Sequence, residues 1–552
     1  KLHNYKLYIM KHLLSYILIS STIVVSTTSC SDFLDTAPYD ALSPATTWNS
    51  ETDARSFAVG CYNKWLDGYT ILYQDCASDI GYNNFPWEKW TVHGNGKLSA
   101  SNTGASFYDF TTIRRCNDFL ENIENISFTD EAEKKDLISQ IRAIRAYKYF
   151  EMNFWYGGVP IIASYTTAEE AKVPRNTEEE VKKYIYDELD ALIPDLKETP
   201  SESGRVAKAT GLAIKMRSAL YWGDYQRAKD AAQAIIDMKK YDLHPNYAEL
   251  FTLKGKSSNE IILSVQYLEN LQGLGVIGQM YNNVDGGWSS IVPTQNLVDM
   301  YEMKDGSTKE ESDIYDPKYP FKDRDPRMEM TILFPGQMWQ AQGKDAVVLN
   351  TLDKEINGIS NDNYPEGLDN ASKTALSWSK YLAPMDQYSN IWDTGACPIV
   401  FRYAEVLLSF AEAENELNGP SDDVYKVLDK IRARVSMPTV NRTKYGTKET
   451  LRELIRRERT IELAGEGLRK ADILRWKDSS GKMLAENLLN SNLYRITGTI
   501  NYNEADPYKR AVIEPGVLSL IETRKFAPYN RYLPIPQSSI DKNPNLKQNP
   551  GY

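Results

Sequence analysis

Hydrophobic residues recur every three or four positions over much of the chain, and this spacing predicts amphipathic helices. Thr177 and Glu180 have the spacing of a capping box, which predicts the start of a further helix. Several of these segments adjoin through short polar turns, so we expect helical hairpins that share one core. The clearest apolar stripes lie at 143–154, 212–220, 228–235, 404–411 and 424–431.

The best-defined hairpin is interrupted by Gly223-Asp224-Tyr225. Gly223, Tyr225 and Ala228 stand at the turn glycine, tyrosine and small alanine of a tetratricopeptide repeat, although Leu212 occupies a position where that repeat prefers Trp. We therefore predict a mainly α fold in which helix pairs stack as divergent repeats. The other candidate helices are 105–126 with 131–156, 400–418 with 421–436, and 449–464.

The middle of the chain has a different composition. Residues 241–398 are rich in Gly, Asn, Asp, Pro and aromatic residues, and the earlier loop 79–104 shares this character. Within the middle region, Asn259–Tyr267 has the pattern of a buried strand. The sequence thus predicts an N-terminal helical half at 30–240, a loop-rich region at 241–398 and a C-terminal helical and tail half at 399–552. Binding residues concentrate in long loops on a rigid scaffold, so we expect the ligand there.

The first 29 residues have the pattern of a secretory signal. Three lysines precede an apolar run at 13–25, which is shorter than the ~20 residues that a membrane span needs. Small residues then lead to Cys30, as in a bacterial lipoprotein, so we expect a lipid anchor on Cys30. Thr27 stands where the lipoprotein motif usually has Leu, and plain secretion is the alternative. Met10 is a second candidate for the start of the signal.

Charge and histidine content narrow the function classes. The formal net charge is −11, which disfavours binding to phosphate backbones, so we expect no nucleic-acid partner. The chain holds four histidines, two of them (His3 and His12) in the signal-like segment. Histidine is the commonest general base and metal ligand, so its scarcity weakens hydrolase and zinc-enzyme hypotheses.

The five cysteines give no sign of a metal or redox site, because no two of them have CxxC spacing. With Cys30 assigned to the lipid, we expect the other four to be buried thiols; a bridge such as Cys61–Cys76 is the alternative. No cofactor or metal is indicated, although scattered Asp residues could hold a calcium ion.

A glycoside hydrolase is the enzyme alternative, and it needs two carboxylates across a cleft. Glu458, Glu462 and Glu466 have four-residue spacing and are interleaved with arginines. This pattern favours a salt-bridged helix face over a catalytic pair. No GxSxG, HExxH or P-loop motif is present. We therefore predict a protein that is not an enzyme.

Several segments, taken in order, resemble the SusD-like (RagB/SusD) family over nearly all of residues 30–552. Among them are RAIRAYKYFEMNFWYGGVP, LRELIRRERTIELAGEGLRKADILRW and the final YLPIPQSSIDKNPNLKQNPGY. The segments that carry the resemblance are 30–38, 142–160, 293–306, 324–327, 451–476 and 532–552.

The resemblance implies four tetratricopeptide-like helix pairs packed against a loop-rich remainder with a few short strands. It also implies a lipid-anchored protein of the outer membrane that faces the cell exterior, captures oligosaccharides or polysaccharides, and delivers them to a SusC-like TonB-dependent transporter. A peptide- or glycoprotein-binding repeat scaffold of the same transporter class is the alternative.

Loop aromatics are the candidate ligand-binding residues, because Trp and Tyr join an apolar face to a polar tip. Trp155 and Trp222 fall at helix ends, and we interpret them as packing residues; the roles of Trp339, Trp378 and Trp392 stay open. Simple coverage of the core is the alternative for Trp87 and Trp288. The candidates are Trp87, Trp90, Trp288, Tyr82 and Tyr281.

Overall fold

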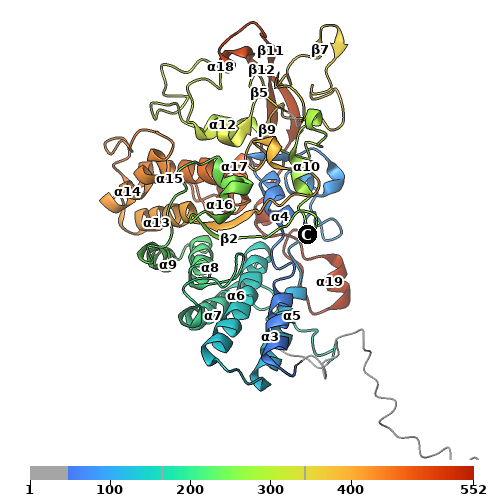
Figure 1. The fold of residues 1–552 in the computed structure, drawn as a ribbon, viewed down its shortest axis with the longest axis vertical. Helices are drawn as coiled ribbons and strands as arrows, with labels where there is room; N and C mark the ends of the chain where they lie inside the picture. Colours follow the sequence, from blue (N-terminus) through green and yellow to red (C-terminus); the bar gives the residue numbers. More distant parts are fainter. Residues whose placement is uncertain (1–47, 163–166, 341–342) are drawn as a thin grey trace, which may run out of the picture.

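The computed structural model describes residues 48–162, 167–340 and 343–552 (Figure 1). Long helices dominate this part of the chain, so the predicted mainly α fold is confirmed. One group fills the lower part of Figure 1: α3 (Glu51–Cys61), α5 (Thr111–Asn122), α6 (Glu131–Tyr156), α7 (Glu178–Leu192), α8 (Lys208–Tyr221) and α9 (Tyr225–Asp237). A second group packs above it: α13 (Tyr403–Asn418), α14 (Asp422–Ala433), α15 (Lys448–Leu463), α16 (Arg469–Arg475) and α17 (Leu484–Leu488).

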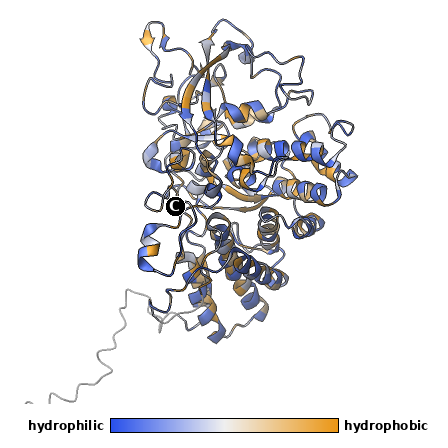
Figure 2. Cartoon of the chain, turned by 180° about the vertical axis from the view of Figure 1, so that it is seen from behind, coloured by the Kyte–Doolittle hydropathy of each residue, from blue (hydrophilic) through white to orange (hydrophobic). Residues whose placement is uncertain are grey.

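Local sequence determines where these helices begin. The Asp224 side chain accepts a hydrogen bond from the Arg227 N–H at 3.2 Å and caps α9, while Gly223 turns the chain with φ +73°. The α8–α9 hairpin is therefore confirmed. At α7, the predicted capping box of Thr177 and Glu180 is also present. Blue and orange residues alternate along the helices in Figure 2, as expected when one face of each helix packs on a core.

The strands form two-stranded antiparallel sheets, six of them within the described residues. The predicted buried strand is confirmed in shorter form as β2 (Ile261–Ser264), which pairs with β10 (Ile399–Arg402). The hairpin of β11 (Asn492–Ile500) and β12 (Ala511–Thr523) was not predicted. The other pairs are β1 (Gly81–Asn83) with β3 (Ile291–Pro293), β4 (Ile332–Leu333) with β9 (Ser377–Trp378), β5 (Met338–Trp339) with β6 (Val347–Val348), and β7 (Glu355–Ile356) with β8 (Ile359–Ser360).

Short helices connect these strands to the helical groups. In the loop-rich region, α10 packs near α4 on the right of Figure 1, beside β1 and β3. The short helices are α4 (Gly68–Tyr73), α10 (Val276–Met280), α11 (Gln295–Met300), α12 (Arg327–Thr331), α18 (Pro507–Arg510) and α19 (Gln537–Lys542).

A network of buried ion pairs joins α15 to the loop-rich region. The Arg402 guanidinium lies 2.7 Å from a carboxylate oxygen of each of Glu260, Glu462 and Glu466. The predicted salt bridges therefore exist, but this side of α15 is buried rather than solvated, because Glu458 and Glu462 are at most 1% exposed. We call these residues the α15 ion network: Arg327, Arg402, Arg432, Arg434, Glu260, Glu458, Glu462 and Glu466.

Residues 526–552 return to the N-terminal helices and bind the end of α6. The Leu533 N–H donates to the Trp155 carbonyl at 2.7 Å, and the Tyr532 hydroxyl donates to Glu178 at 2.6 Å. Gly157 ends α6 with φ +67°, and a Cβ there would lie 2.8 Å from the Tyr532 ring. Arg175 donates to the carbonyl of Lys547 at 2.9 Å. Residues 526–552 thus hold the C-terminal end of α6, and we call this contact the clasp.

Cys30 and the signal-like segment lie outside the described residues. Cys61, Cys76, Cys116 and Cys397 are buried free thiols, so the alternative Cys61–Cys76 bridge is not formed. Across residues 48–162, 167–340 and 343–552, no helix combines the length and the apolar character that a membrane crossing requires.

Candidate functional site

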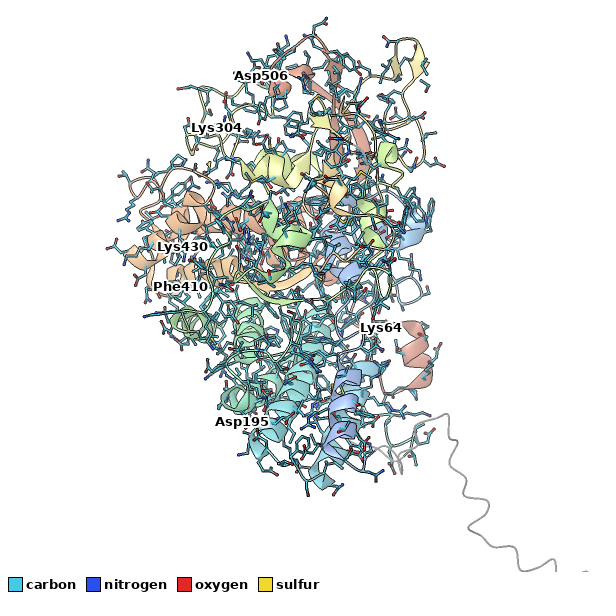
Figure 3. All side chains as sticks on the ribbon, viewed as in Figure 1. Lys64, Asp195, Lys304, Phe410, Lys430 and Asp506 are labelled. Atoms are coloured by element: carbon cyan, nitrogen blue, oxygen red, sulfur yellow. The ribbon has the colours of Figure 1, made fainter. Side chains whose placement is uncertain are left out.

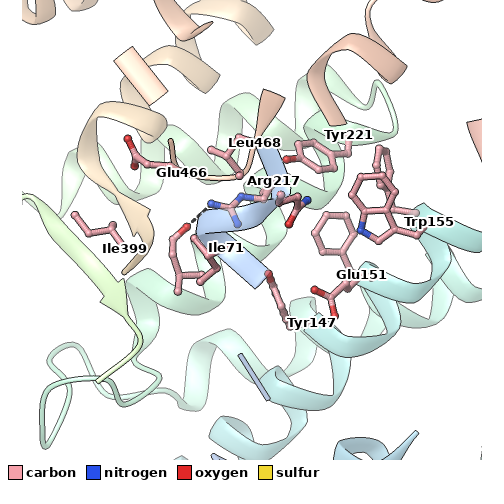
Figure 4. A pocket seen from close by; sticks show the side chains of 14 residues that line it. Ile71, Tyr147, Glu151, Trp155, Arg217, Tyr221, Ile399, Glu466 and Leu468 are labelled. Atoms are coloured by element: carbon pink, nitrogen blue, oxygen red, sulfur yellow. Dashed lines mark hydrogen bonds between the residues drawn. The ribbon is translucent and has the colours of Figure 1, made fainter. Parts of the chain in front are cut away.

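One small cavity lies between the two helical groups, and Figure 4 shows the side chains that line it. Its volume is about 60 Å³, which suffices for a few water-sized molecules but not for a sugar ring. The Arg217 guanidinium beside it is held by Glu405 at 2.6–2.7 Å, so its charge is already neutralised. This cavity is a packing feature of the core, and the candidate site lies elsewhere.

The loops after β1 and before β3 meet at one end of their sheet, because Asn83 pairs with Ile291 in the antiparallel register. Glu88 fastens them together: its carboxylate accepts from the Asn83 amide at 2.6 Å and from the Ser290 hydroxyl at 2.9 Å. Trp87 belongs to the loop after β1. Its side chain is 71% exposed and stacks on the Phe85 ring. The sheet therefore carries two aromatic loops on one side of the molecule.

Two of the predicted ligand residues are part of the core instead. Trp90 is 6% exposed and stacks on Tyr73, with 6.0 Å between ring centroids. Tyr281 is fully buried, and its hydroxyl donates to the Leu382 carbonyl. Neither offers a free ring face, because their Gly- and Asn-rich loops fold inward over apolar neighbours. Tyr82 lies half-buried in β1, where burial raises its pKa to about 12.

Trp288 is exposed, and the fold brings it to a second exposed indole. The rings of Trp288 and Trp392 lie 4.6 Å apart at an angle of 54°, and they are 45% and 37% exposed. Gly278 on α10 leaves room for the Trp392 ring, because a Cβ at this position would fall 2.6 Å from that ring. We call Trp288 and Trp392 the indole pair. Sequence left the role of Trp392 open, and its position in the polar loop 389–395 was the available signal.

A hollow of about 350 Å³ opens beside the indole pair, and we call it the Trp392 hollow. Asp285 lies on its wall and accepts from the Trp339 indole N–H at 2.9 Å. Burial raises the pKa of Asp285 to about 6, so the carboxylate is mostly ionised at neutral pH. The hollow is lined by Val284, Asp285, Gly286, Lys344, Met385, Ser389, Asn390, Ile391 and Trp392.

Val284 also borders a second hollow of about 390 Å³, which we call the Tyr502 hollow. Tyr502 is 50% exposed there, and its hydroxyl accepts from the Asn350 amide at 2.9 Å. Asp285, Trp339 and Tyr502 were not predicted as site residues. Because they come from three different loops, only the tertiary fold reveals that they are neighbours. The lining residues are Val284, Trp339, Val347, Val348, Leu349, Asn350, Ile356, Asn363 and Tyr502.

These groups define the chemistry that the site can accept. Indole faces bind apolar C–H surfaces, while amides, a carboxylate and hydroxyls exchange hydrogen bonds. One acid, Asp285, and one base, Lys344, line the Trp392 hollow, so it favours no strong net charge in a ligand. Within the described part of the chain, no group of His, Cys, Asp and Glu side chains has the arrangement of a metal site. The site therefore suits an uncharged molecule rich in hydroxyls.

Comparisons with known proteins identify the family and the fold. The family model described as "SusD family" matches residues 259–552, and one described as "Starch-binding associating with outer membrane" matches 32–214. A curated relative, SusD-like protein P25 of Formosa agariphila, is 25% identical over 490 residues, covering 82% of this chain and 88% of the relative.

Two solved structures from Bacteroides fragilis have a similar fold. A SusD-like carbohydrate binding protein superposes with a TM-score of 0.79 at 27% identity, covering 91% of this chain and 100% of that protein. A further SusD-like protein has a TM-score of 0.76 at 26% identity, covering 94% and 100%.

Proposed function

The chain belongs to the SusD family, and on that premise we propose that it binds an uncharged oligosaccharide or polysaccharide at the indole pair and does not alter it chemically. The indole pair is the observation that carries this proposal. Two large aromatic rings exposed side by side cost free energy in water, and a sugar's C–H face covers them well. The similar protein from B. fragilis that is named as carbohydrate binding supports the choice of ligand class.

The walls of the two hollows would then orient the sugar. The Asp285 carboxylate accepts hydrogen bonds from hydroxyls, and the amide of Asn390 can both donate and accept. Lys344 supplies a cation that balances Asp285. Such groups fix the direction of a ligand that the indoles hold by contact area.

The arrangement of the carboxylates supports binding without hydrolysis. A glycosidase requires two of them across the scissile bond. Among the described residues that line the Trp392 hollow, Asp285 is the one carboxylate. Glu458, Glu462 and Glu466 are buried against arginines, in agreement with the predicted salt bridges. A peptide ligand, the alternative raised by the helical repeats, has no comparable feature in its favour.

The proposal is tested by affinity electrophoresis and calorimetry against neutral polysaccharides such as starch, laminarin and xylan, with peptides as the competing class. Trp288→Ala and Trp392→Ala should each weaken glycan binding by about 2 kcal/mol, because each removes a stacking face. Tyr529→Ala is the matched control, since Tyr529 is an exposed aromatic (44%) on the 526–552 segment. Peptide binding alone, or unchanged glycan affinity in both Trp variants, would refute the proposal.

We further propose that the protein is an outer-membrane lipoprotein, anchored through Cys30, which passes its ligand to a SusC-like TonB-dependent transporter. The family description "associating with outer membrane" and the signal-like segment before Cys30 support this location.

Cys30→Ala should release the protein from membranes, because the proposed lipid would be attached to this thiol, and the melting temperature should stay the same. Membrane fractionation and labelling with palmitate measure the effect. If the variant stays membrane-bound and the unaltered protein carries no lipid, the anchor is disproved. Co-purification of a large barrel protein in mild detergent tests the transporter separately.

A further inference from the structure

A larger hollow of about 950 Å³ opens beside Tyr69, and we call it the Tyr267 groove. It runs between the loop that joins α3 to α4, the loop before α8, and the segment after β2. The residues that line it include Tyr62, Asn63, Lys64, Trp65, Asp67, Tyr69, Glu202, Arg205, Gln266, Tyr267 and Gln272.

The groove adjoins the indole pair across one glycine. A Cβ at Gly275 would lie 2.8 Å from the Tyr69 hydroxyl and 3.0 Å from the Trp392 carbonyl oxygen, so Gly275 lets Tyr69 and the Trp392 backbone approach each other closely. The adjoining loops are also bonded to each other: the Leu274 N–H donates to the Thr394 carbonyl at 2.8 Å. Lys64 in Figure 3 lies on the same flank as α4 and α10 in Figure 1. The segments that border the Trp392 hollow and the groove are therefore in direct contact.

The groove repeats the chemistry of the site. Tyr69 offers an aromatic face at 38% exposure, and the Arg205 guanidinium covers the Tyr62 ring at 4.8 Å. The side chains of Asn63, Gln266 and Gln272 belong to exposed residues and supply amide donors and acceptors.

The charges along the groove cancel. Two bases, Lys64 and Arg205, are balanced by two acids, Asp67 and Glu202. This balance gives no electrostatic preference for a polyanion or a polycation. Aromatic faces, amides and no net charge are the features that an uncharged sugar chain requires.

We infer that the Tyr267 groove is a second sugar-binding subsite, and that one long neutral glycan occupies it together with the Trp392 hollow. This inference rests on the proposed function and adds a property to it, namely selection by chain length. A chain bound at the indole pair presents its next sugars to the groove at high effective concentration, so the second contact adds affinity without a second encounter. A short oligosaccharide reaches only one of the two subsites.

The test uses the full chain and the neutral polysaccharide for which it has the highest affinity. Binding of the trisaccharide and of the decasaccharide of that glycan is then compared. The double variant Tyr69→Ala/Gln272→Ala should weaken decasaccharide binding about tenfold and leave trisaccharide binding unchanged. Tyr69→Phe keeps the ring and should bind both ligands as the unaltered protein does. Tyr69 and Gln272 are exposed, so melting temperatures should stay equal.

Each result discriminates. Equal affinity for both oligosaccharides in the unaltered protein, or a double variant that keeps its decasaccharide affinity while Trp392→Ala loses it, overturns the second subsite and leaves the proposed function intact. A double variant that loses trisaccharide affinity to the same extent also overturns it. Failure of the unaltered protein to bind any glycan removes both proposals, whereas peptide binding in the groove overturns the second subsite alone.

Discussion

The α15 ion network and the indole pair show opposite uses of polar and aromatic groups. In the network, each charged group meets opposite charges inside the protein: Arg402 alone contacts three carboxylates, and it is 1% exposed. At the indole pair, Trp288 and Trp392 keep over a third of their surface in water. Carboxylates satisfied by buried arginines have little capacity left for a ligand, whereas exposed rings and open amides do.

The contrast also shows why residue type is a poor guide to function here. The acids at 458, 462 and 466 are of the residue type that a glycosidase uses, yet their surroundings make them structural, as their interleaving with arginines predicted. Arginines hold the pKa values of Glu458 and Glu466 below the usual range, so these acids stay ionised in the interior. What a side chain contacts, more than what it is, separates the two regions.

The largest effect should come from breaking the network. Arg402→Met removes one guanidinium and leaves Glu260, Glu462 and Glu466 short of a partner, which should cost about 4 kcal/mol of unfolding free energy. Urea denaturation measures the loss. Arg442→Met is the control: its pair with Asp422 is more than half exposed on both sides, so less than about 1 kcal/mol should be lost. Equal losses would show that burial does not distinguish these pairs.

A smaller loss of stability should distinguish a buried from an exposed tryptophan within one loop. Trp90 and Trp87 are three residues apart, but Trp90 is 6% exposed and Trp87 is 71% exposed. Trp90→Ala should cost about 3 kcal/mol of stability through the cavity it leaves, with glycan affinity unchanged in the folded fraction. Trp87→Ala should leave the melting temperature almost unchanged. A stable Trp90→Ala variant that loses affinity would return Trp90 to the ligand site.

The smallest effect should appear in the pH dependence of binding. Because Asp285 has its pKa raised to about 6, lowering the pH through that value protonates an acceptor in the Trp392 hollow, and glycan affinity should fall about fivefold. The free energy of unfolding should change in the opposite direction: protonation of Asp285 weakens glycan binding but stabilises the fold. The folded state binds the proton more tightly than the unfolded chain, so ionisation of Asp285 lowers stability as the pH rises from about 4 to about 6.

Asp285→Asn provides the control for both effects. The amide does not titrate, so the difference between variant and unaltered protein isolates Asp285 from the acids of the network, whose lowered pKa values make stability fall on acidification. Calorimetry of binding and thermal unfolding at matched pH values measure the two quantities. A variant that retains the full pH dependence of binding would exclude Asp285 as the titrating group.

Local sequence was sufficient for most of the long helices, although α3 was not predicted. The α8–α9 hairpin was predictable because its cap, its turn glycine and its apolar stripes lie within one short segment. The β11–β12 hairpin was missed because its strands carry no regular alternation: β12 exposes Val517, Leu518 and Leu520 together, and the pairing register shifts twice.

The candidate site was only partly predictable. Trp288 and Trp87 lie in Gly- and Asn-rich loops and are exposed, as expected, but Trp90 and Tyr281 share the same kind of sequence and are buried. Exposure depends on which distant segment covers a ring. Trp392 gained its significance only from Gly278 on α10 and Trp288 in the loop before β3, which the fold brings next to it.

The clasp between residues 526–552 and α6 has a consequence for biosynthesis. The groups that hold the end of α6, such as the Leu533 N–H and the Tyr532 hydroxyl, leave the ribosome long after α6 itself. Until they arrive, the carbonyl of Trp155 lacks its partner and the Gly157 turn lacks the ring that covers it. We therefore expect the nascent chain to complete its fold only after translation has reached this segment.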